Sequence, residues 1–330
     1  MARIDDCLDE YREWCNKLGI VTVSDVNRLI DQGRVNWLIN VSEIWQEQKI
    51  SEISRQIKDN IGRKRIIMIS GPSSSGKTSF ANRLALHLKV LGISSCAISL
   101  DDYYLPRERV PLDENGKYDF ETIEALDYEL FNNNVYDLIA GKTAQLPMFD
   151  FRVSAPKTET RPLTLSDDEV IIVEGIHGLN DKLTSNIPTD NKYRIYCTAL
   201  TALCRDDGTK IRSRTTRLIR RLIRDYNFRG TGVERTLEQW PMVERGAEKY
   251  IFPFTDSADI IFNSSILYEH CIYKIYLNEL LFGMSEEHSG YESTRDLRRL
   301  INSFKHIDRE FVPKTSLVRE FVGGSTLIEQ

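Results

Sequence analysis

The sequence has no long apolar run and few of the features that mark a secreted or membrane protein. No stretch approaches the roughly 18 consecutive apolar residues that cross a bilayer, and the first residues, MARIDDCLDEYREW, contain no apolar segment of a signal peptide. The six cysteines are scattered, without a C-x-x-C pair or a neighbouring histidine cluster, which argues against a disulfide framework and a zinc site. We therefore expect a cytoplasmic protein with free thiols and no membrane partner.

An excess of charge of one sign is also absent. The formal net charge is -5 in 330 residues, so bulk charge gives no reason to expect nucleic acid as a partner. The one local exception is an arginine cluster at residues 212–229. The sequence has no N-K-x-D guanine-reading motif, which argues against a GTPase switch, and it shows no internal repeat.

Short apolar runs alternate with helical patterns along the chain. We predict strands at the following ranges: 64–70, 94–100, 170–174, 193–198 and 258–262. Strands that alternate with helices are typical of an α/β fold with a doubly wound parallel sheet, here of the P-loop NTPase type. We place the P-loop domain at residues 61–265, with helical additions at 1–60 and 266–330.

The additions carry no chemistry that the sequence reveals. In residues 1–60, Ser24 can cap one helix that ends near Gly33, and Ser42 precedes a second helical pattern. We interpret this region as a structural arm or an oligomer contact, and a homo-oligomer stays open. The tail at 312–330 is expected to be irregular.

The most informative motif is GPSSSGKT at residues 71–78, which matches G-x-x-x-x-G-K-[ST] between a predicted strand and an amphipathic helix. Gly71 and Gly76 let the backbone curl so that N–H groups face a phosphate, and the helix N-terminus attracts the anion. Lys77 is expected to reach the β- and γ-phosphates, and Thr78 to offer its hydroxyl to Mg²⁺. The whole predicted ATP-binding loop is Gly71, Ser73, Ser74, Ser75, Gly76, Lys77, Thr78 and Ser79.

Acidic residues follow two of the predicted strands. Asp101 and Asp102 come after the strand that ends at Leu100, and Glu174 ends the strand VIIVE. Ligands bind beyond the carboxyl ends of parallel strands, so Glu174 and Asp101 are candidate Mg²⁺ ligands together with Thr78. The alternatives are local capping by Glu174 and turn formation by the aspartate pair.

The arginine cluster lies on a predicted amphipathic helix. Leu218, Ile219, Leu222 and Ile223 form one face, and the other face consists of Arg217, Arg220, Arg221 and Arg224. Such a face can be a solvated surface, an RNA-binding patch or a lid over phosphates. Beside a P-loop, fixed positive charge near the γ-phosphate favours the lid, and we place that lid at about residues 212–232.

These residues and motifs resemble the uridine kinase/phosphoribulokinase branch of P-loop kinases from residue 64 to about 265. The resemblance implies that Asp101 of LDDYY activates the acceptor hydroxyl and that Asp119 of YDFETIEALD holds the ribose hydroxyls. LPMFDFR resembles a hairpin that covers the base, at about residues 145–162. It implies base contacts by Phe149, with Tyr104 and Arg152 also on the substrate side.

The likeness is greatest to a uridine kinase-related subgroup, through EGIHGLN, FRGTGVERTLEQWP, IFPF and the tail REFVGGS. Longer members of that subgroup carry a region similar to part of threonyl-tRNA synthetase, which this sequence lacks or has lost by trimming. The sequence also lacks the histidine with which uridine kinases read a pyrimidine, and Ser154 falls near that place. The base preference is therefore expected to be loose.

The resulting hypothesis is an ATP- and Mg²⁺-dependent kinase that transfers the γ-phosphate directly to the 5′-hydroxyl of a nucleoside, with pyrimidines preferred. In it, Lys77 and Asp101 are the catalytic residues, and the lid arginines Arg217, Arg221 and Arg224 close over the phosphates. Two alternatives stay open. One is a kinase of a sugar phosphate or a pantothenate-like alcohol, and the other is a regulatory protein that binds a nucleoside triphosphate without turnover.

Overall fold

The computed structural model describes residues 3–150, 155–166, 168–282, 284 and 291–328. The sheet and the short ladders contain β1 Ile66–Ser70, β2 Ser94–Ser99, β3 Thr143–Leu146, β4 Phe149–Asp150, β5 Ala155–Pro156, β6 Arg161–Thr164, β7 Glu169–Glu174, β8 Lys192–Thr198 and β9 Ile260–Asn263. The helices are α1 Ile4–Leu18, α2 Val23–Asp31, α3 Val35–Asn60, α4 Lys77–Val90, α5 Tyr128–Ile139, α6 Ser213–Arg229, α7 Val233–Tyr250, α8 Glu269–Leu281, α9 Tyr291–Ser303 and α10 Arg319–Val322.

The centre of the molecule is a five-stranded parallel sheet with the strand order β2-β7-β1-β8-β9. All five predicted strands are present, and the predicted α/β class is confirmed. β7 pairs on both sides, with Ile69 beside Glu174 on one neighbour and Ser99 beside Glu174 on the other. This register brings the carboxyl ends of β1, β2 and β7 to one edge of the sheet, where ligands of such folds bind.

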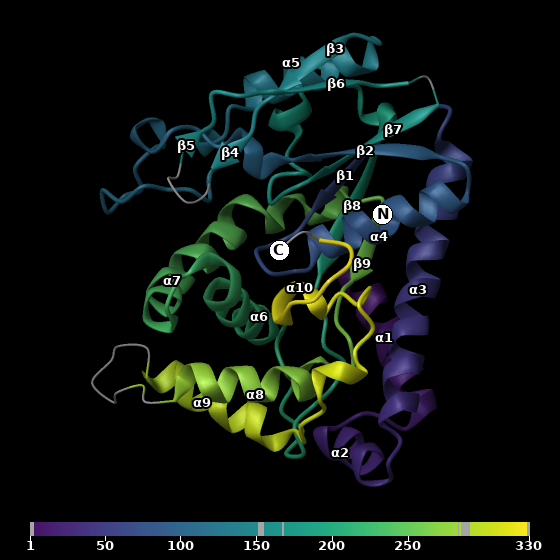
Figure 1. Ribbon diagram of the computed structural model, residues 1–330, viewed down its shortest axis with the longest axis vertical. Coiled ribbons are helices and arrows are strands. Elements are labelled where there is room, and N and C mark those ends of the chain that lie inside the picture. The colour runs from purple at the N-terminus through teal and green to yellow at the C-terminus, as the bar shows by residue number, and fades with distance from the viewer. Residues whose placement is uncertain (1–2, 151–154, 167, 283, 285–290, 329–330) are drawn as a thin grey trace.

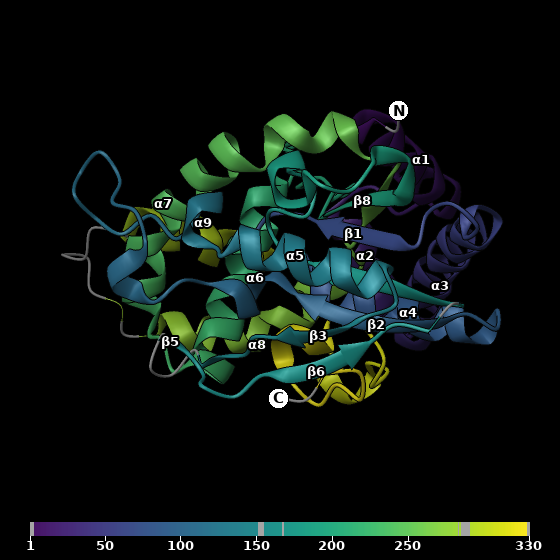
Figure 2. The same cartoon turned by 90° about the horizontal axis from the view of Figure 1, so that it is seen from above.

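Helices cover both faces of the sheet because alternate strand residues point to opposite sides. Ile67 and Ile69 of β1 share a hydrophobic cluster with residues of α3 and α4. Ile66 and Met68 share a second cluster with α5 and with the β3–β6 ladder. Figures 1 and 2 show α5 with β3 and β6 at one end of the molecule and the long α3 along its side.

The N-terminal helices begin at other residues than the sequence suggested. α2 is capped by Thr22, whose side chain accepts from the Asp25 N–H while Asp25 accepts in return, and Ser24 lies inside the helix. This reciprocal capping box satisfies two backbone donors, which a serine cap alone would not do. α3 begins at Val35, so Ser42 lies within it and donates to the carbonyl oxygen of Leu38 at 2.7 Å.

The C-terminal tail is irregular, as expected, except for α10, and it belongs to the core. Leu317, Val318 and Phe321 are fully buried in the same hydrophobic cluster as α3, α4 and α6. Figure 1 shows α10 beside α6, and Glu320 of α10 accepts a hydrogen bond from Ser79 in the first turn of α4. Within the described ranges, no helix combines the length and the apolar character that crossing a bilayer requires.

Candidate active site

The phosphate loop connects β1 to α4 in a conformation that its glycines permit. A Cβ atom at Gly71 would lie 2.0 Å from the carbonyl oxygen of Cys197, so only glycine fits there. Gly76 caps α4 with a φ of 86°, in the left-handed region that favours glycine. The loop therefore presents the start of α4 and Lys77 to a cavity of about 330 Å³.

That cavity collects residues that are far apart in the sequence. Its lining contains most of the predicted catalytic, metal and substrate positions together with several residues that were not predicted. The lining residues are Ser73, Ser74, Lys77, Thr78, Asp101, Tyr104, Phe120, Glu121, Phe149, Glu174, Ile176, Arg221, Arg224 and Arg229. The predicted loop residues Gly71, Ser75 and Gly76 shape the loop without lining the cavity, and Ser79 is also outside the lining because its N–H and hydroxyl donate to Glu320.

Two carboxylates lie at the carboxyl ends of β2 and β7. Glu174 accepts a hydrogen bond from the Ser99 hydroxyl at 3.0 Å. Burial, and secondly the charge of Asp101, raise the pKa of Glu174 to about 7. An acid that is held so close to another acid, and removed from water, is stabilised in its charged form by a cation.

The oxygen donors at this edge fit Mg²⁺. Thr78 supplies a hydroxyl, and Asp101 and Glu174 supply carboxylates, which are the hard ligands this ion prefers. Across the described ranges, no group of three or more His, Cys, Asp or Glu side chains is arranged to hold a metal by itself. Mg²⁺ commonly binds through one or two carboxylates together with substrate phosphates, so this donor set suits an ion that arrives with the nucleotide.

Three arginines of α6 converge on one residue of the phosphate loop. Arg217 Nε donates to the Ser73 carbonyl oxygen at 3.0 Å, and Arg221 and Arg224 donate to the Ser73 hydroxyl at 3.0 and 3.4 Å. Burial lowers the pKa of Arg217 and of Arg224 to about 10, so both are charged at neutral pH. Nη2 of Arg217 and Nε of Arg224 are buried without a hydrogen-bond partner among the described residues, although Arg224 Nε lies 3.8 Å from the Asp225 carboxylate. Arg221 and Arg224 line the cavity, whereas Arg217 does not.

The fourth arginine of the predicted basic face does not belong to it. Arg220 is fully buried and forms a 2.8 Å ion pair with Glu269, which is also fully buried. Its remaining donors bond to the Ser264 hydroxyl and carbonyl oxygen at 3.0 and 2.9 Å. The helical period that placed Arg220 among the polar residues could not show that α8 brings an acid against it.

The cavity is also lined by aromatic rings and by one partly buried acid, Glu121. The rings of Tyr104 and Phe149 lie 6.0 Å apart, and Tyr104 donates to the Phe120 carbonyl oxygen at 3.1 Å. Burial raises the pKa of Glu121 to about 7, and the charges of Arg221 and Arg217 oppose that shift. Sequence analysis had not selected Glu121.

Asp119, the predicted sugar-binding residue, does not line this cavity. One of its oxygens accepts from the Tyr250 hydroxyl at 2.9 Å, and the other accepts from the Glu121 N–H at 3.1 Å. It borders a separate hollow between residues 112–119 and α7. Asp119 and Glu121 are two positions apart in YDFETIEALD. The Asp119 side chain closes a turn by accepting from the Glu121 N–H, and in this turn Glu121 is the residue that faces the cavity.

Asp101 and Asp102 also have different surroundings. Asp101 lines the cavity, whereas Asp102 accepts a hydrogen bond from the Phe149 N–H at 3.1 Å and so connects the end of β2 to the β4–β5 ladder. Burial raises the pKa of Asp102. Two further predicted positions on this hairpin, Arg152 and Ser154, lie outside the described residues.

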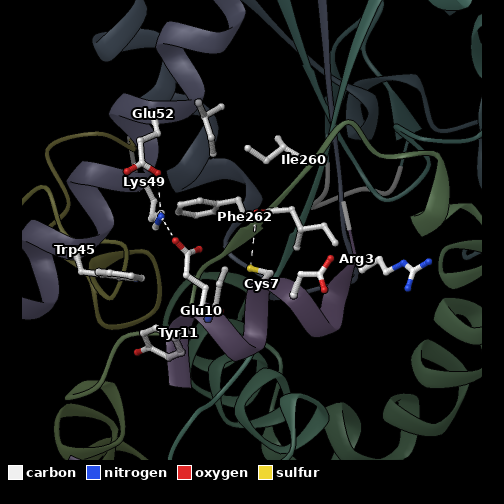
Figure 3. A pocket seen from close by; sticks show the side chains of 13 residues that line it. Arg3, Cys7, Glu10, Tyr11, Trp45, Lys49, Glu52, Ile260 and Phe262 are labelled. Atoms are coloured by element: carbon white, nitrogen blue, oxygen red, sulfur yellow. Dashed lines mark hydrogen bonds and ion pairs between the residues drawn. The ribbon is translucent and has the colours of Figure 1, made fainter. Parts of the chain in front are cut away.

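A larger cavity of about 420 Å³ lies elsewhere, where α1 and α3 meet the free edge of β9 (Figure 3). Its lysine, Lys49, already pairs with Glu52 at 2.9 Å and with Glu10, and the Cys7 thiol contacts the carbonyl oxygen of Ile261. It contains no residue of the phosphate loop. The cavity beside the loop is therefore the candidate active site, although it is the smaller one.

Comparison with known proteins agrees with this geometry. Residues 66–204 and 210–267 match the Phosphoribulokinase / Uridine kinase family. A uridine kinase of Macrococcus caseolyticus is 31% identical over 202 residues, which are 61% of this chain and 88% of that protein. A uridine kinase of Staphylococcus carnosus is 32% identical over 197 residues, 59% of this chain and 85% of that protein.

A solved structure of a possible uridine kinase from Bacillus stearothermophilus covers 66% of this chain and 98% of its own, with a TM-score of 0.44 and 20% identity. The family match includes the phosphate loop, both strand-end acids and the three α6 arginines. The chain belongs to the phosphoribulokinase/uridine kinase family and is a kinase that phosphorylates an alcohol acceptor.

Proposed function

We propose that the chain transfers the γ-phosphate of ATP to the 5′-hydroxyl of a nucleoside, with pyrimidine nucleosides preferred. The observation that carries the proposal is the shared cavity, which is lined by the phosphate loop and arginines and also by aromatic rings and a partly buried acid. A triphosphate fits the first set of residues, and a ribose with its base fits the second. The uridine kinases of Macrococcus and Staphylococcus support the same substrate class.

On the donor side, the loop backbone and Lys77 hold the β- and γ-phosphates, and Arg221 and Arg224 add positive charge from α6. Thr78 and Glu174, with Asp101, would hold Mg²⁺. The chemistry that the ion supplies when bound is neutralisation of charge on the transferred phosphoryl group. The hydrogen bonds of three arginines to Ser73 hold α6 over the loop.

On the acceptor side, Asp101 orients the 5′-hydroxyl and accepts its proton. A carboxylate suffices because little proton transfer is needed early in a loose transition state. Asp102 cannot share this role while its carboxylate is bonded to the Phe149 N–H.

For the sugar, we propose Glu121 in place of Asp119. Its side chain lines the cavity and faces the lid arginines, whereas the Asp119 carboxylate is used by Tyr250 and by the turn. A carboxylate accepts hydrogen bonds from the paired hydroxyls of a ribose. Glu121 is therefore the better-placed sugar ligand.

The base would lie against Tyr104 and Phe149. Aromatic contacts accept every base and discriminate little, and an apolar slot separates similar substrates by roughly 10²-fold. We therefore expect the preference for pyrimidines to be moderate.

The test is ADP release in a coupled assay with uridine, cytidine, thymidine, adenosine and guanosine, together with identification of the phosphorylated product. We expect 5′-monophosphates, with uridine and cytidine giving the highest kcat/KM. A preference for uridine above about 10³-fold over all other nucleosides would contradict the loose base site. If no nucleoside supports ADP release, the acceptor is another alcohol or the site does not turn over, and the proposal fails.

A further inference from the structure

The C-terminal tail lies directly on the phosphate loop. A Cβ atom at Gly76 would be 3.0 Å from both terminal methyl groups of Leu317, so the tail packs against the turn that begins α4. Leu317 and Phe321 are fully buried on either side of Glu320. This part of the chain lies beyond residue 267, where the family match ends.

Glu320 places a carboxylate on the first turn of α4. One of its oxygens accepts from the Ser79 hydroxyl at 2.7 Å and from the Ser79 N–H at 3.3 Å. Its other oxygen lies 3.8 Å from Nη1 of Arg224. Glu320 is 6% exposed, so it holds this position away from solvent.

The donors that Glu320 uses belong to the anion site of the loop. N–H groups in the first turn of a helix have no partner within the helix and attract anions. In a phosphate loop these groups hold the α- and β-phosphates, and the lysine reaches the β- and γ-phosphates. Ser79 is two residues beyond Lys77. We therefore assign its N–H and hydroxyl as donors to the α-phosphate, which is the phosphate nearest the nucleoside. A carboxylate and a phosphate cannot accept from the same N–H at once.

The tail around Glu320 is built to hold it there. The Arg319 guanidinium donates to the carbonyl oxygens of Val312 at 2.6 Å and of Arg309 at 2.9 Å, which closes the tail upon itself. Asn227 of α6 donates to the Phe321 carbonyl oxygen at 3.2 Å. Gly323 and Gly324 follow with φ values of 85° and 73°, in a region that most other residues avoid. The segment 316–323 is thus held by side-chain hydrogen bonds, including those to the carbonyl oxygens of Val322 and Gly323, and it ends at two residues of permissive backbone conformation.

We propose that Glu320 is an internal competitor for the α-phosphate: its carboxylate bonds to Ser79, and a nucleoside triphosphate that takes Ser79 displaces it and loosens the segment 316–323. The proposal rests on the proposed function only in naming a nucleoside triphosphate as the ligand. The consequence is a selective loss of affinity. A ligand that places a phosphate at Ser79 must displace the Glu320 carboxylate, whereas a ligand without a phosphate at that position need not. Inorganic pyrophosphate needs only the positions beside Lys77, so its affinity is not lowered by competition with Glu320.

The test is the equilibrium binding of ATP, ADP and pyrophosphate to the full-length wild type and to Glu320→Gln, measured by calorimetry. The variant keeps the shape of the side chain and removes its charge. We expect ATP and ADP to bind about tenfold tighter or more, because the competing state no longer lowers the apparent affinity, and the affinity for pyrophosphate to change less than threefold. Glu310→Gln is the matched control, since Glu310 lies just before the tail and its side chain is 78% exposed.

Unchanged or weaker ATP binding by Glu320→Gln would overturn the proposal, as would an equal gain in Glu310→Gln. If Glu320→Gln does not fold, hydrogen exchange of the wild type decides: exchange over residues 316–323 should rise when ATP is added, and unchanged or slower exchange would refute the displacement. These readouts need no turnover. An enzyme that phosphorylates no nucleoside would refute the proposed function and leave the binding result standing.

Discussion

Helix α6 carries arginines in two different environments. Arg220 is fully buried, and its donors bond to Glu269 and to Ser264. Arg217, Arg221 and Arg224 lie nearby on the same helix, yet they converge on Ser73, and buried nitrogens of Arg217 and Arg224 lack hydrogen-bond partners among the described residues. A buried cation with a complete set of protein partners stabilises the fold, whereas one with spare donors beside a cavity is prepared for a ligand.

Two pairs of acids repeat this contrast. Asp102 bonds to the backbone of the hairpin, and its neighbour Asp101 lines the cavity. Asp119 bonds to Tyr250 and to its own turn, and Glu121 lines the cavity. In each pair, the residue whose hydrogen bonds stay within the protein serves as a control for the one that faces the ligand.

The largest loss of function should follow removal of the Lys77 ammonium. Lys77→Ala should weaken ATP binding and lower turnover by roughly 10³-fold or more, because no other side chain of the loop can place a positive charge between the β- and γ-phosphates. The unfolding free energy should change little, since Lys77 faces the cavity. Steady-state kinetics and denaturant unfolding measure the two quantities, and near-normal turnover would show that the site is misplaced.

Asp101→Asn should lower kcat by roughly 10²–10⁴-fold, the range typical of a lost general base, with ATP affinity nearly unchanged. The matched variant is Asp102→Asn, which should act mainly on the hairpin and lower kcat far less. If Asp102→Asn proves the more damaging change, the base is the residue that bonds to Phe149, and the contrast between the two aspartates is reversed.

A smaller effect is expected on the sugar side. Glu121→Gln should raise the KM for the nucleoside by roughly 10–100-fold, as expected for the loss of hydrogen bonds to a charged group, and leave the KM for ATP within about twofold. Asp119→Asn should change the nucleoside KM much less. A larger effect from Asp119→Asn would return the sugar contact to the residue that the resemblance first indicated.

The smallest predicted effect is a pH dependence of Mg²⁺ binding. The pKa of Glu174 is raised to about 7, mainly by burial, and a metal binds the deprotonated carboxylate. The affinity for Mg²⁺ should therefore fall by up to about tenfold for each pH unit below 7 and level off above it. Glu174→Gln should bind Mg²⁺ weakly and without this dependence, and an equally steep dependence in the variant would assign the titration to another group.

The same shift has a consequence for stability. The folded protein keeps the Glu174 proton up to about pH 7, whereas an unfolded glutamate loses it near 4.5. The contribution of Glu174 to the unfolding free energy is therefore complete below pH 4.5 and is lost as the pH rises to 7. The difference in unfolding free energy between the ligand-free wild type and Glu174→Gln should change over this window in that direction.

Much of the donor side could be predicted from sequence, because its signals are local. The motif GPSSSGKT defines the loop, and apolar runs that end in Asp101 and Glu174 identify strands whose ends meet. The parallel sheet then brings these residues together without further information.

The remaining features depend on contacts between distant segments. The pairing of Arg220 with Glu269 and the packing of Glu320 on Ser79 join residues 49 and 241 positions apart. The choice between Asp119 and Glu121 depends on a turn and on α7, which supplies Tyr250. No periodicity or motif carries this information, so the sequence patterns placed Arg220 on the basic face, pointed to Asp119 for the sugar, and indicated neither Glu121 nor Glu320.

The most direct test of the contrast within α6 compares Arg220→Met with Arg221→Met, measuring the unfolding free energy and the ATP affinity of each. Arg220→Met leaves Glu269 buried without its partner and should lose about 3–5 kcal/mol of stability. Arg221→Met should lose less stability than Arg220→Met, because Asp225, which pairs with Arg221 Nε at 3.1 Å, keeps Arg224 and Arg229 as partners. It should bind ATP about tenfold more weakly or worse. Loss of stability in Arg221→Met with unchanged ATP affinity would contradict the account, because the lid arginines would then hold the fold and not the phosphates.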